Sequence, residues 1–91
     1  MIRNFKCKQT QLLYEGGRPR RFRSFQAQAE RKLQMLDNAV ELLDLRSPPG
    51  NMLEKLSGDR AEQYSIRINR QWRICFVWRD EPMDVEITDY H

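Results

Sequence analysis

Three residues that can donate or accept protons end the chain: Asp89, Tyr90 and His91, the last of these being the only histidine in the sequence. Imidazole is the side chain that titrates near neutral pH. Arg73, in the string QWRICFVW, adds a planar guanidinium that can bind a phosphate with two parallel hydrogen bonds. Cleavage of RNA by the neighbouring 2′-hydroxyl needs a base, a cation on the charged phosphorane and an acid for the leaving 5′-oxygen. These residue types can supply those parts if the fold brings them together.

An antiparallel sheet would bring them together. If residues 83–89 form a strand that pairs with residues 72–78, the end of the chain returns to the level of Arg73. The alternative reading is purely structural. Arg73 would then pair with a Glu or Asp on a neighbouring strand, Tyr90 would cover the core, and the final histidine would only end the chain.

The second half of the chain alternates apolar and polar residues with the period of two that is typical of strands. This pattern predicts strands at Tyr64–Ile68, Trp72–Trp78 and Met83–Asp89, joined by turns at Asn69–Gln71 and Arg79–Pro82. Consecutive strands with short connections form an antiparallel meander.

The first half predicts helices. A weak alternation suggests a short strand at Met1–Phe5, and a short helix at Thr10–Glu15 is expected to end at Gly16-Gly17. Ser24 is expected to cap a longer helix. Apolar residues recur along that helix at helical spacing: Phe25, Ala29, Leu33 and Leu36.

The longer helix is expected to stop at Asp37-Asn38. Asn38 with Glu41 resembles a capping box, which predicts another helical turn or two over Ala39–Leu45 before the string RSPPGN. The fold class is therefore α+β, with helices packed on one face of a small antiparallel sheet. The other face or its rim remains for chemistry.

Composition excludes several classes of protein. Ninety-one residues predict a single domain, 1–91. No apolar run approaches the ~18 residues of a membrane span, and the N-terminal residues have no signal-peptide pattern. Cys7 and Cys75 lie far apart without metal-ligand spacing, as in a reduced cytoplasmic protein. We expect no membrane contact, no metal and no cofactor.

Positive charge is concentrated at the start of the chain. Residues 1–32 carry nine Lys and Arg against two Glu, a balance of +7, whereas residues 33–91 carry seven against eleven, a balance of −4. The densest stretch is GRPRRFR, with arginines around Phe22. Such a cluster can bind phosphates, but it can equally be a solvated turn or a site for an acidic protein.

Two strings, GDRAEQYSIRINRQWRICFVW and the terminal VEITDYH, together resemble the HigB toxins of the RelE-like superfamily. The resemblance covers essentially the whole chain, including the connection SPPGNMLEKLSGDR. It implies the RelE-like fold, with N-terminal helices on a small twisted antiparallel sheet. It also implies a ribosome-dependent mRNA endonuclease, encoded beside a helix-turn-helix antitoxin of the HigA type. DNA contact would be indirect, through that antitoxin.

The resemblance also implies site residues. The family's active site falls on Arg73, Asp89, Tyr90 and His91, and the family's asparagine falls on Gln71. Two other positions depart from the pattern, because well-known members have a histidine where this chain has Glu54 and a lysine where it has Ser57. Glu54 is therefore a candidate base. The expected RNA- and ribosome-binding residues are Lys55, Arg67, Arg70, Arg18, Arg20, Arg21 and Arg23.

Two further functions compete with the nuclease. Superfamily relatives that resemble ParE poison DNA gyrase without cutting RNA, and a degenerate toxin would keep only its antitoxin contacts. Arg73 with the terminal Asp89-Tyr90-His91 favours the nuclease, whereas Glu54 in place of histidine keeps the binding module open. Close relatives also carry an acidic residue where this chain has Arg70, which makes the expected hairpin tip more basic.

Overall fold

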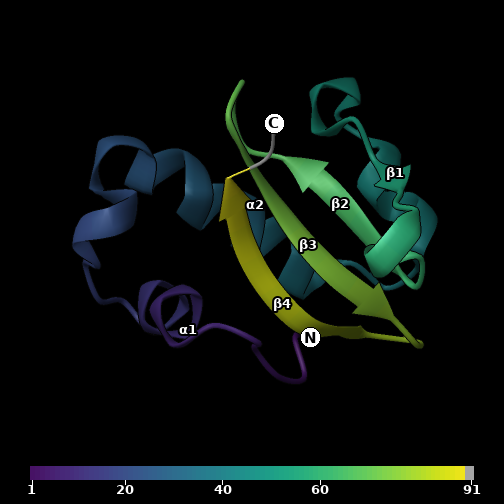
Figure 1. Cartoon of the computed structure of the whole chain (residues 1–91), viewed down its shortest axis with the longest axis horizontal. Coiled ribbons are helices and arrows are strands. Elements are labelled where there is room, and N and C mark those ends of the chain that lie inside the picture. The colour runs from purple at the N-terminus through teal and green to yellow at the C-terminus, as the bar shows by residue number, and fades with distance from the viewer. Residues whose placement is uncertain (90–91) are drawn as a thin grey trace.

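In the computed structural model, which describes residues 1–89, four antiparallel strands form one sheet in the order β1–β2–β3–β4 (Figure 1). The strands are β1 (Glu54–Lys55), β2 (Gln63–Arg67), β3 (Trp72–Trp78) and β4 (Pro82–Asp89). The three longer strands confirm the predicted meander to within one or two residues. β1 was not predicted, because a two-residue strand leaves no alternation in the sequence.

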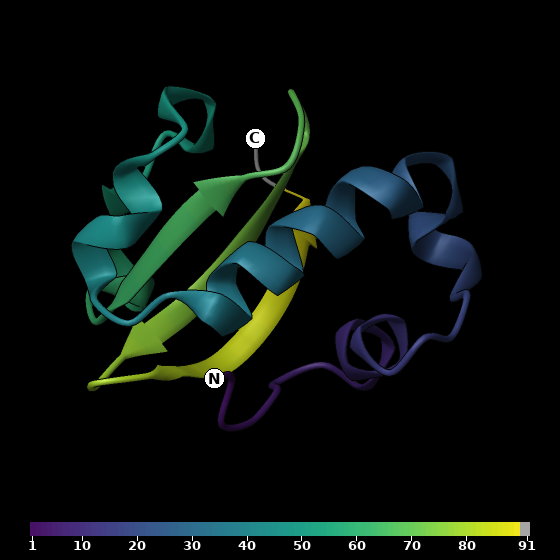
Figure 2. The same cartoon turned by 180° about the vertical axis from the view of Figure 1, so that it is seen from behind.

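One helix covers a face of the sheet, and a second helix lies beside it at the edge strand β4. Figure 2 shows α2 (Gln26–Asn38) lying across the strands, while α1 (Lys8–Tyr14) packs beside α2 and β4. The opposite face, toward the viewer in Figure 1, carries no helix of this pair. The predicted α+β arrangement is confirmed.

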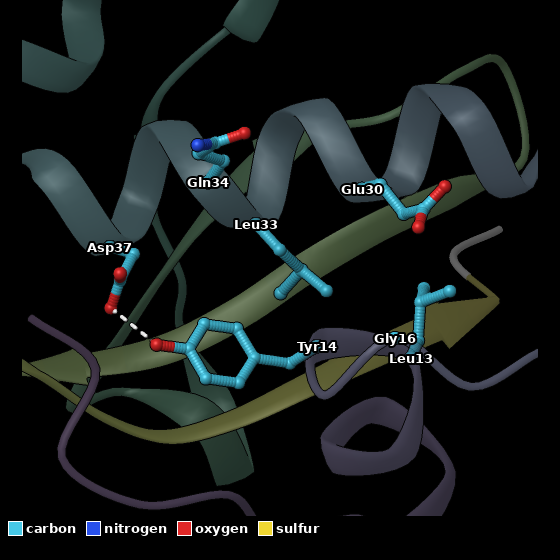
Figure 3. Close-up of a pocket in the computed structure, with 7 residues that line it drawn as sticks. All are labelled: Leu13, Tyr14, Gly16, Glu30, Leu33, Gln34 and Asp37. Carbon is cyan, nitrogen blue, oxygen red and sulfur yellow. Dashed lines mark hydrogen bonds between the residues drawn. The ribbon is translucent and has the colours of Figure 1, made fainter.

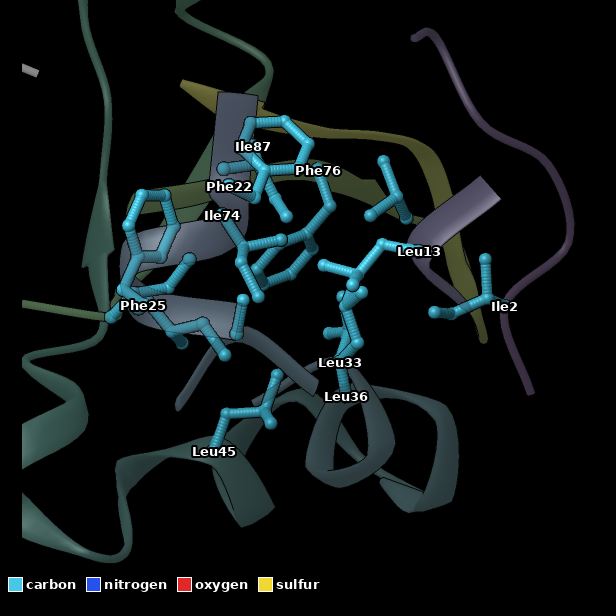
Figure 4. Close-up of a cluster of buried hydrophobic side chains, with 14 residues drawn as sticks. Ile2, Leu13, Phe22, Phe25, Leu33, Leu36, Leu45, Ile74, Phe76 and Ile87 are labelled. Atoms are coloured by element: carbon cyan, nitrogen blue, oxygen red, sulfur yellow. The ribbon is translucent and has the colours of Figure 1, made fainter. Parts of the chain in front are cut away.

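The core lies between the helices and the sheet. Figure 4 shows the buried side chains that meet there from the helices, the strands and the 3-10 turns. Ile66, Ile74 and Ile87 come from three adjacent strands. Ile74 on β3 lies directly opposite Ile66 on β2 and directly opposite Ile87 on β4, and all three are buried. Because side chains alternate along a strand, their neighbours Ser65, Arg73 and others point to the other face.

The helices begin and end slightly differently from the prediction. α1 ends one residue before Glu15, and Gly16 then adopts a φ of 97°, which glycine tolerates. Thr10, buried on α1, accepts a 3.0 Å hydrogen bond from the Ile87 backbone N–H and so fixes α1 against β4.

Ser24 does not cap a helix, so that prediction was wrong. Residues Arg20–Phe25 form a 3-10 helix that runs directly into α2, and no side chain caps α2. Buried Phe22 and Phe25 set this path, because both rings must reach the core. Met1–Phe5 is not a strand either. It runs beside β4 with a single isolated bridge from Phe5 to Val85.

The capping box lies three residues later than predicted. Glu41 and Asp44 form it, at the start of a 3-10 helix over Leu42–Arg46, and Asn38 instead ends α2. Backbone N–H groups of Glu41 and Val40 donate to the Asp44 carboxylate and lower its pKa. Further 3-10 turns follow at Pro49–Asn51 and Gly58–Arg60. Among residues 1–89, none of the helices has the length and apolar character needed to cross a membrane.

Candidate active site

The open face of the sheet, which is the face without α1 and α2, carries the candidate site. Arg73 lies opposite Arg67 on β2 and opposite Thr88 on β4. Like charges placed directly across a strand pair repel each other. The pair of arginines therefore marks a place where an anion would be stabilised.

Arg73 is buried, with 7% of its surface exposed, and it is the only buried charged residue among those that the structure describes. Its Nε donates to Ser65 Oγ at 2.7 Å, and its Nη2 donates to the Met52 carbonyl at 2.7 Å. Nη2 also lies 3.4 Å from the Ser65 carbonyl oxygen. A charge is tolerated at low exposure only when hydrogen bonds or counter-charges replace its water.

Glu54 lies beside Arg73. β1 pairs Glu54 with Ser65, and this register places the Glu54 side chain on the open face, with its Oε1 3.7 Å from Arg73 Nη2. The Glu54 side chain is 47% exposed, so it is accessible to a bound molecule. The ion pair expected under the structural alternative is thus present, and the same contact brings the candidate base to the guanidinium.

The segment before β1 is held in place by Asn51, which is fully buried. Its Nδ2 donates to the carbonyls of Leu45, at 3.1 Å, and Ser47, at 3.3 Å, and its Oδ1 accepts from Lys32 Nζ. Met52 follows with left-handed backbone angles, φ 46° and ψ 52°. The anchor and the turn together direct the Met52 carbonyl toward Arg73.

Arg67, the neighbour of Arg73 across the strands, is also oriented by local contacts. Its Nε donates to the Asn69 carbonyl at 3.0 Å, and its Nη1 lies 3.3 Å from Met52 Sδ. Arg70 is exposed at the hairpin tip. Lys55 is exposed on β1, but it is opposite Tyr64 and so faces the helix-covered side of the edge strand.

The end of β4 returns to the start of β3, as predicted. Trp72 is opposite Asp89, and Gln71 Nε2 donates to Asp89 Oδ2 at 2.9 Å. Because successive side chains alternate, Asp89 is on the same side as Trp72, whereas Arg73 points to the open face. Tyr90 and His91 lie outside the described residues, so their expected positions stay predictions.

The basic stretch at 18–23 divides into two parts. The Arg21 guanidinium lies over the rings of Trp72, at 5.2 Å, and Phe22, at 5.7 Å, which is cation–π distance. Trp72 in turn stacks on Phe25 at 5.0 Å. Arg21 is thereby held at the end of the sheet that carries Gln71 and Asp89. Arg20 is exposed beside it in sequence.

Arg18 and Arg23 line a different feature, a surface cavity of about 250 Å³ along α2 that also includes Glu30. A larger cavity of about 400 Å³ lies between α1 and α2 (Figure 3). Across it the Tyr14 hydroxyl donates to Asp37 Oδ1 at 3.1 Å. Desolvation, together with the hydrogen bond and the negative charge of Asp37, raises the pKa of Tyr14.

Sequence reasoning missed Ser65 and Met52. Neither a serine nor a backbone carbonyl forms a recognisable sequence motif, and their contacts with Arg73 are seen only in the hydrogen bonds of the folded chain. Cys75, beside them on the open face, is fully buried, and this burial raises the pKa of its thiol. No group of three or more His, Cys, Asp or Glu residues within 1–89 could hold a metal ion.

Comparisons with known proteins show the family of this chain. Residues 3–91 match the family model described as the RelE-like toxin of the type II toxin–antitoxin system HigB. Toxin HigB-1 of Vibrio cholerae is 40% identical over 82 residues, which cover 88% of this chain and 86% of that protein. An uncharacterized protein of Haemophilus influenzae is 38% identical over 61 residues, covering 67% of this chain and 60% of the relative. The chain therefore belongs to the HigB-like family, the RelE-like toxins of type II toxin–antitoxin systems.

Proposed function

We propose that this toxin is a ribosome-dependent mRNA endonuclease that inhibits translation. The observation that carries the proposal is the hydrogen-bonded, buried guanidinium of Arg73 on the open face, beside the exposed Glu54 carboxylate and opposite Arg67. A preoriented cation next to an accessible carboxylate suits a reaction in which negative charge develops on a phosphate.

The proposed reaction uses the RNA's own 2′-hydroxyl and requires neither a metal nor a cofactor. A base removes the hydroxyl proton, the 2′-oxygen bonds to the adjacent phosphorus, and the bond to the 5′-oxygen breaks as an acid protonates it. The products are a 2′,3′-cyclic phosphate and a 5′-hydroxyl end. Arg73 would stabilise the phosphorane, and Glu54, with its Oε1 3.7 Å from Arg73 Nη2, would act as the base.

The remaining site residues would act from the end of β4. Asp89 and Gln71 form a hydrogen-bonded pair there. We assign the acid to His91, with Tyr90 and Asp89 as its expected neighbours. Gln71 would orient Asp89 through that hydrogen bond. These roles follow the family pattern, and each is open to substitution.

Dependence on the ribosome follows from this small set of proton-transfer groups. Positioning must supply much of the rate, and a well-held geometry can contribute about 7–11 kcal/mol. The ribosome would present the transcript in one conformation. Basic residues, most of them exposed, would bind its RNA, namely Lys55, Arg67, Arg70, Arg18, Arg20, Arg21 and Arg23.

A toxin of this class has an antitoxin partner. We propose a HigA-type helix-turn-helix antitoxin that also represses the operon, so that DNA is contacted only through the antitoxin. The site of action would be the cytoplasm, where ribosomes and transcripts are found.

Primer extension on transcripts after brief induction of the toxin tests the function. We expect new 5′ ends within translated regions for the wild type, and the same cuts in vitro on translating ribosomes but not on free single-stranded RNA. Arg73→Ala should lower the cleavage rate by roughly 10²–10³, the typical cost of one preorganised charge donor. Arg79→Ala is the matched control, because Arg79 lies beyond the other end of β3 and is exposed.

Two results would contradict the proposal. The first is full cleavage by folded Arg73→Ala, and the second is equal cleavage of free and ribosome-bound RNA. The gyrase-poison alternative predicts that DNA damage precedes the arrest of protein synthesis, and the binding-module alternative predicts no new 5′ ends at all.

A further inference from the structure

We propose that Ser65, acting together with the Met52 carbonyl, is a positioning residue that fixes the direction of the Arg73 guanidinium. The inference rests on the proposed function and extends it to a residue that does not contact the RNA. Neither Ser65 nor Met52 has a side chain with an expected role in the chemistry.

The first part of the argument is the geometry at Ser65. This residue is fully buried on β2, and its hydroxyl accepts the 2.7 Å hydrogen bond from Arg73 Nε. Ser65 is opposite Cys75 in the register, and Arg73 lies two residues before Cys75 on β3. The contact is therefore a diagonal one between adjacent strands on the same face, within reach of a long side chain.

The second part is the Met52 carbonyl. Nε and Nη2 lie along one edge of the planar guanidinium, where Nε donates to the Ser65 hydroxyl and Nη2 donates to the Met52 carbonyl at 2.7 Å and, more weakly, to the Ser65 carbonyl at 3.4 Å. Two acceptors along one edge fix both the position and the rotation of a rigid plane. The remaining nitrogen then points in one direction relative to the sheet.

The Met52 carbonyl is itself rigidly placed. Asn51, one residue earlier, is fully buried and bonded to the carbonyls of Leu45 and Ser47. Met52 adopts left-handed backbone angles, which are costly for a residue with a side chain and persist only where the surroundings impose them. The two acceptors thus come from separate, well-anchored segments.

The position of Glu54 indicates why Arg73 needs the contacts from Ser65 and Met52, which together we call the clamp. Its carboxylate lies 3.7 Å from Arg73 Nη2, longer than a direct hydrogen bond. A guanidinium without the Ser65 hydroxyl could rotate toward this carboxylate and form a closer ion pair. That rotation would aim the cation away from the phosphorane and neutralise the candidate base. Ser65 would therefore act through Arg73 by preventing it.

The experiment compares Ser65→Ala with Cys75→Ala. Both remove one heavy atom from fully buried neighbours on the same face, but it is the Ser65 hydroxyl that accepts the hydrogen bond from Arg73 Nε. In single-turnover cleavage on translating ribosomes, Ser65→Ala should lower the rate at saturation by about 10- to 100-fold, the scale of a misplaced catalytic group. The ribosome concentration at half-maximal rate should not change. Cys75→Ala should cleave at the wild-type rate.

A spectroscopic readout tests the clamp without the reaction. In the free protein, the Arg73 Nε–H proton should be protected from exchange in the wild type and in Cys75→Ala, and should lose this protection in Ser65→Ala. Ser65→Thr keeps the hydroxyl, so it should recover both the protection and most of the rate. Circular dichroism would show whether Ser65→Ala is folded. If it is not, Ser65→Thr provides the test, because loss of Arg73 Nε–H protection in folded Ser65→Thr would contradict the proposed role of the Ser65 hydroxyl.

The double variant separates positioning from general structural damage. Ser65→Ala should cause no further loss of rate in an Arg73→Ala background, because its effect passes through Arg73. A further tenfold loss there would overturn the inference, as would wild-type rates in Ser65→Ala while Arg73→Ala is inactive. The latter result leaves the proposed nuclease intact, whereas full activity of Arg73→Ala removes both.

Discussion

At the scale of single residues, the burial of Arg73 is the most informative feature of this toxin. Removing a guanidinium from water is unfavourable, and a fold built for stability alone would replace it with an apolar side chain. Here Ser65, Met52 and Glu54 surround it instead, on the sheet face that α1 and α2 do not cover. Retention of such a group is typical of a functional site.

The sequence predicted part of this site. Arg73 and Asp89 were correctly expected at the same end of the sheet, because the antiparallel register is set by the alternation of apolar residues. The same alternation points the Asp89 and Arg73 side chains to opposite faces of the sheet. Their shared level at one end of the sheet predicted only that they would be close. Ser65 and Met52 could not be found in this way, since a serine and a backbone carbonyl have no recognisable pattern.

Deletion of His91 is the residue-scale prediction for the end of the chain. If His91 is the acid, its loss should lower cleavage by roughly 10²–10⁴, the usual contribution of a positioned proton-transfer group. Stability should stay within ~0.5 kcal/mol, as for a typical surface change. The pH–rate profile should lose the limb that the His91 imidazole contributes. Rates and urea unfolding measured on the same preparation check this.

Two outcomes contradict that assignment. A parallel loss of folding would make His91 structural, and a fully active, stable deletion variant would leave Glu54 and Asp89 as the carboxylate candidates for proton transfer.

At the scale of elements, the regular segments were predictable and the irregular ones were not. Strands β2, β3 and β4 have strong period-two patterns, and α2 buries Ala29, Leu33 and Leu36 at helical spacing. The 3-10 turns have no such periodicity, since each spans only three to six residues. Their path is set by tertiary burial of Phe22, Phe25 and Leu45, which is why the predicted cap at Ser24 and box at Asn38 were wrong.

Gly16→Ala is the element-scale prediction. The end of α1 depends on the φ of 97° at Gly16, where an alanine would be strained although its Cβ would meet nothing within 4 Å. The free energy of unfolding should fall by about 1–2 kcal/mol. Gly50→Ala is the matched control, because an added Cβ also meets open space there and the φ of Gly50 lies outside the left-handed region. Its free energy of unfolding should therefore change by less than ~0.5 kcal/mol, or rise slightly. Equal urea midpoints for the two variants would show that the left-handed turn contributes nothing.

At the scale of the whole molecule, the positive charge does not form one surface. The sequence placed nine cationic residues in the first 32 positions, and the fold then separates them. Arg21 lies over Trp72 at the end of the sheet that carries the candidate site, whereas Arg18 and Arg23 line the cavity along α2. The basic stretch can therefore serve RNA with one part and a protein partner with the other.

Arg21→Glu and Arg23→Glu test this division. Both residues are exposed and lie two positions apart on the same 3-10 helix, so each substitution changes the net charge equally. We expect Arg21→Glu to weaken ribosome binding and to reduce its dependence on salt by about one phosphate contact, because Arg21 is held beside the end of the sheet that is proposed to bind RNA. Arg23→Glu should bind ribosomes like the wild type and lose affinity for an acidic surface of the antitoxin. Sedimentation with ribosomes at several salt concentrations, alongside calorimetry with the antitoxin, measures both effects. Identical losses for the two variants in both assays would mean that the arginines act only through total charge, and the proposed division would then be wrong.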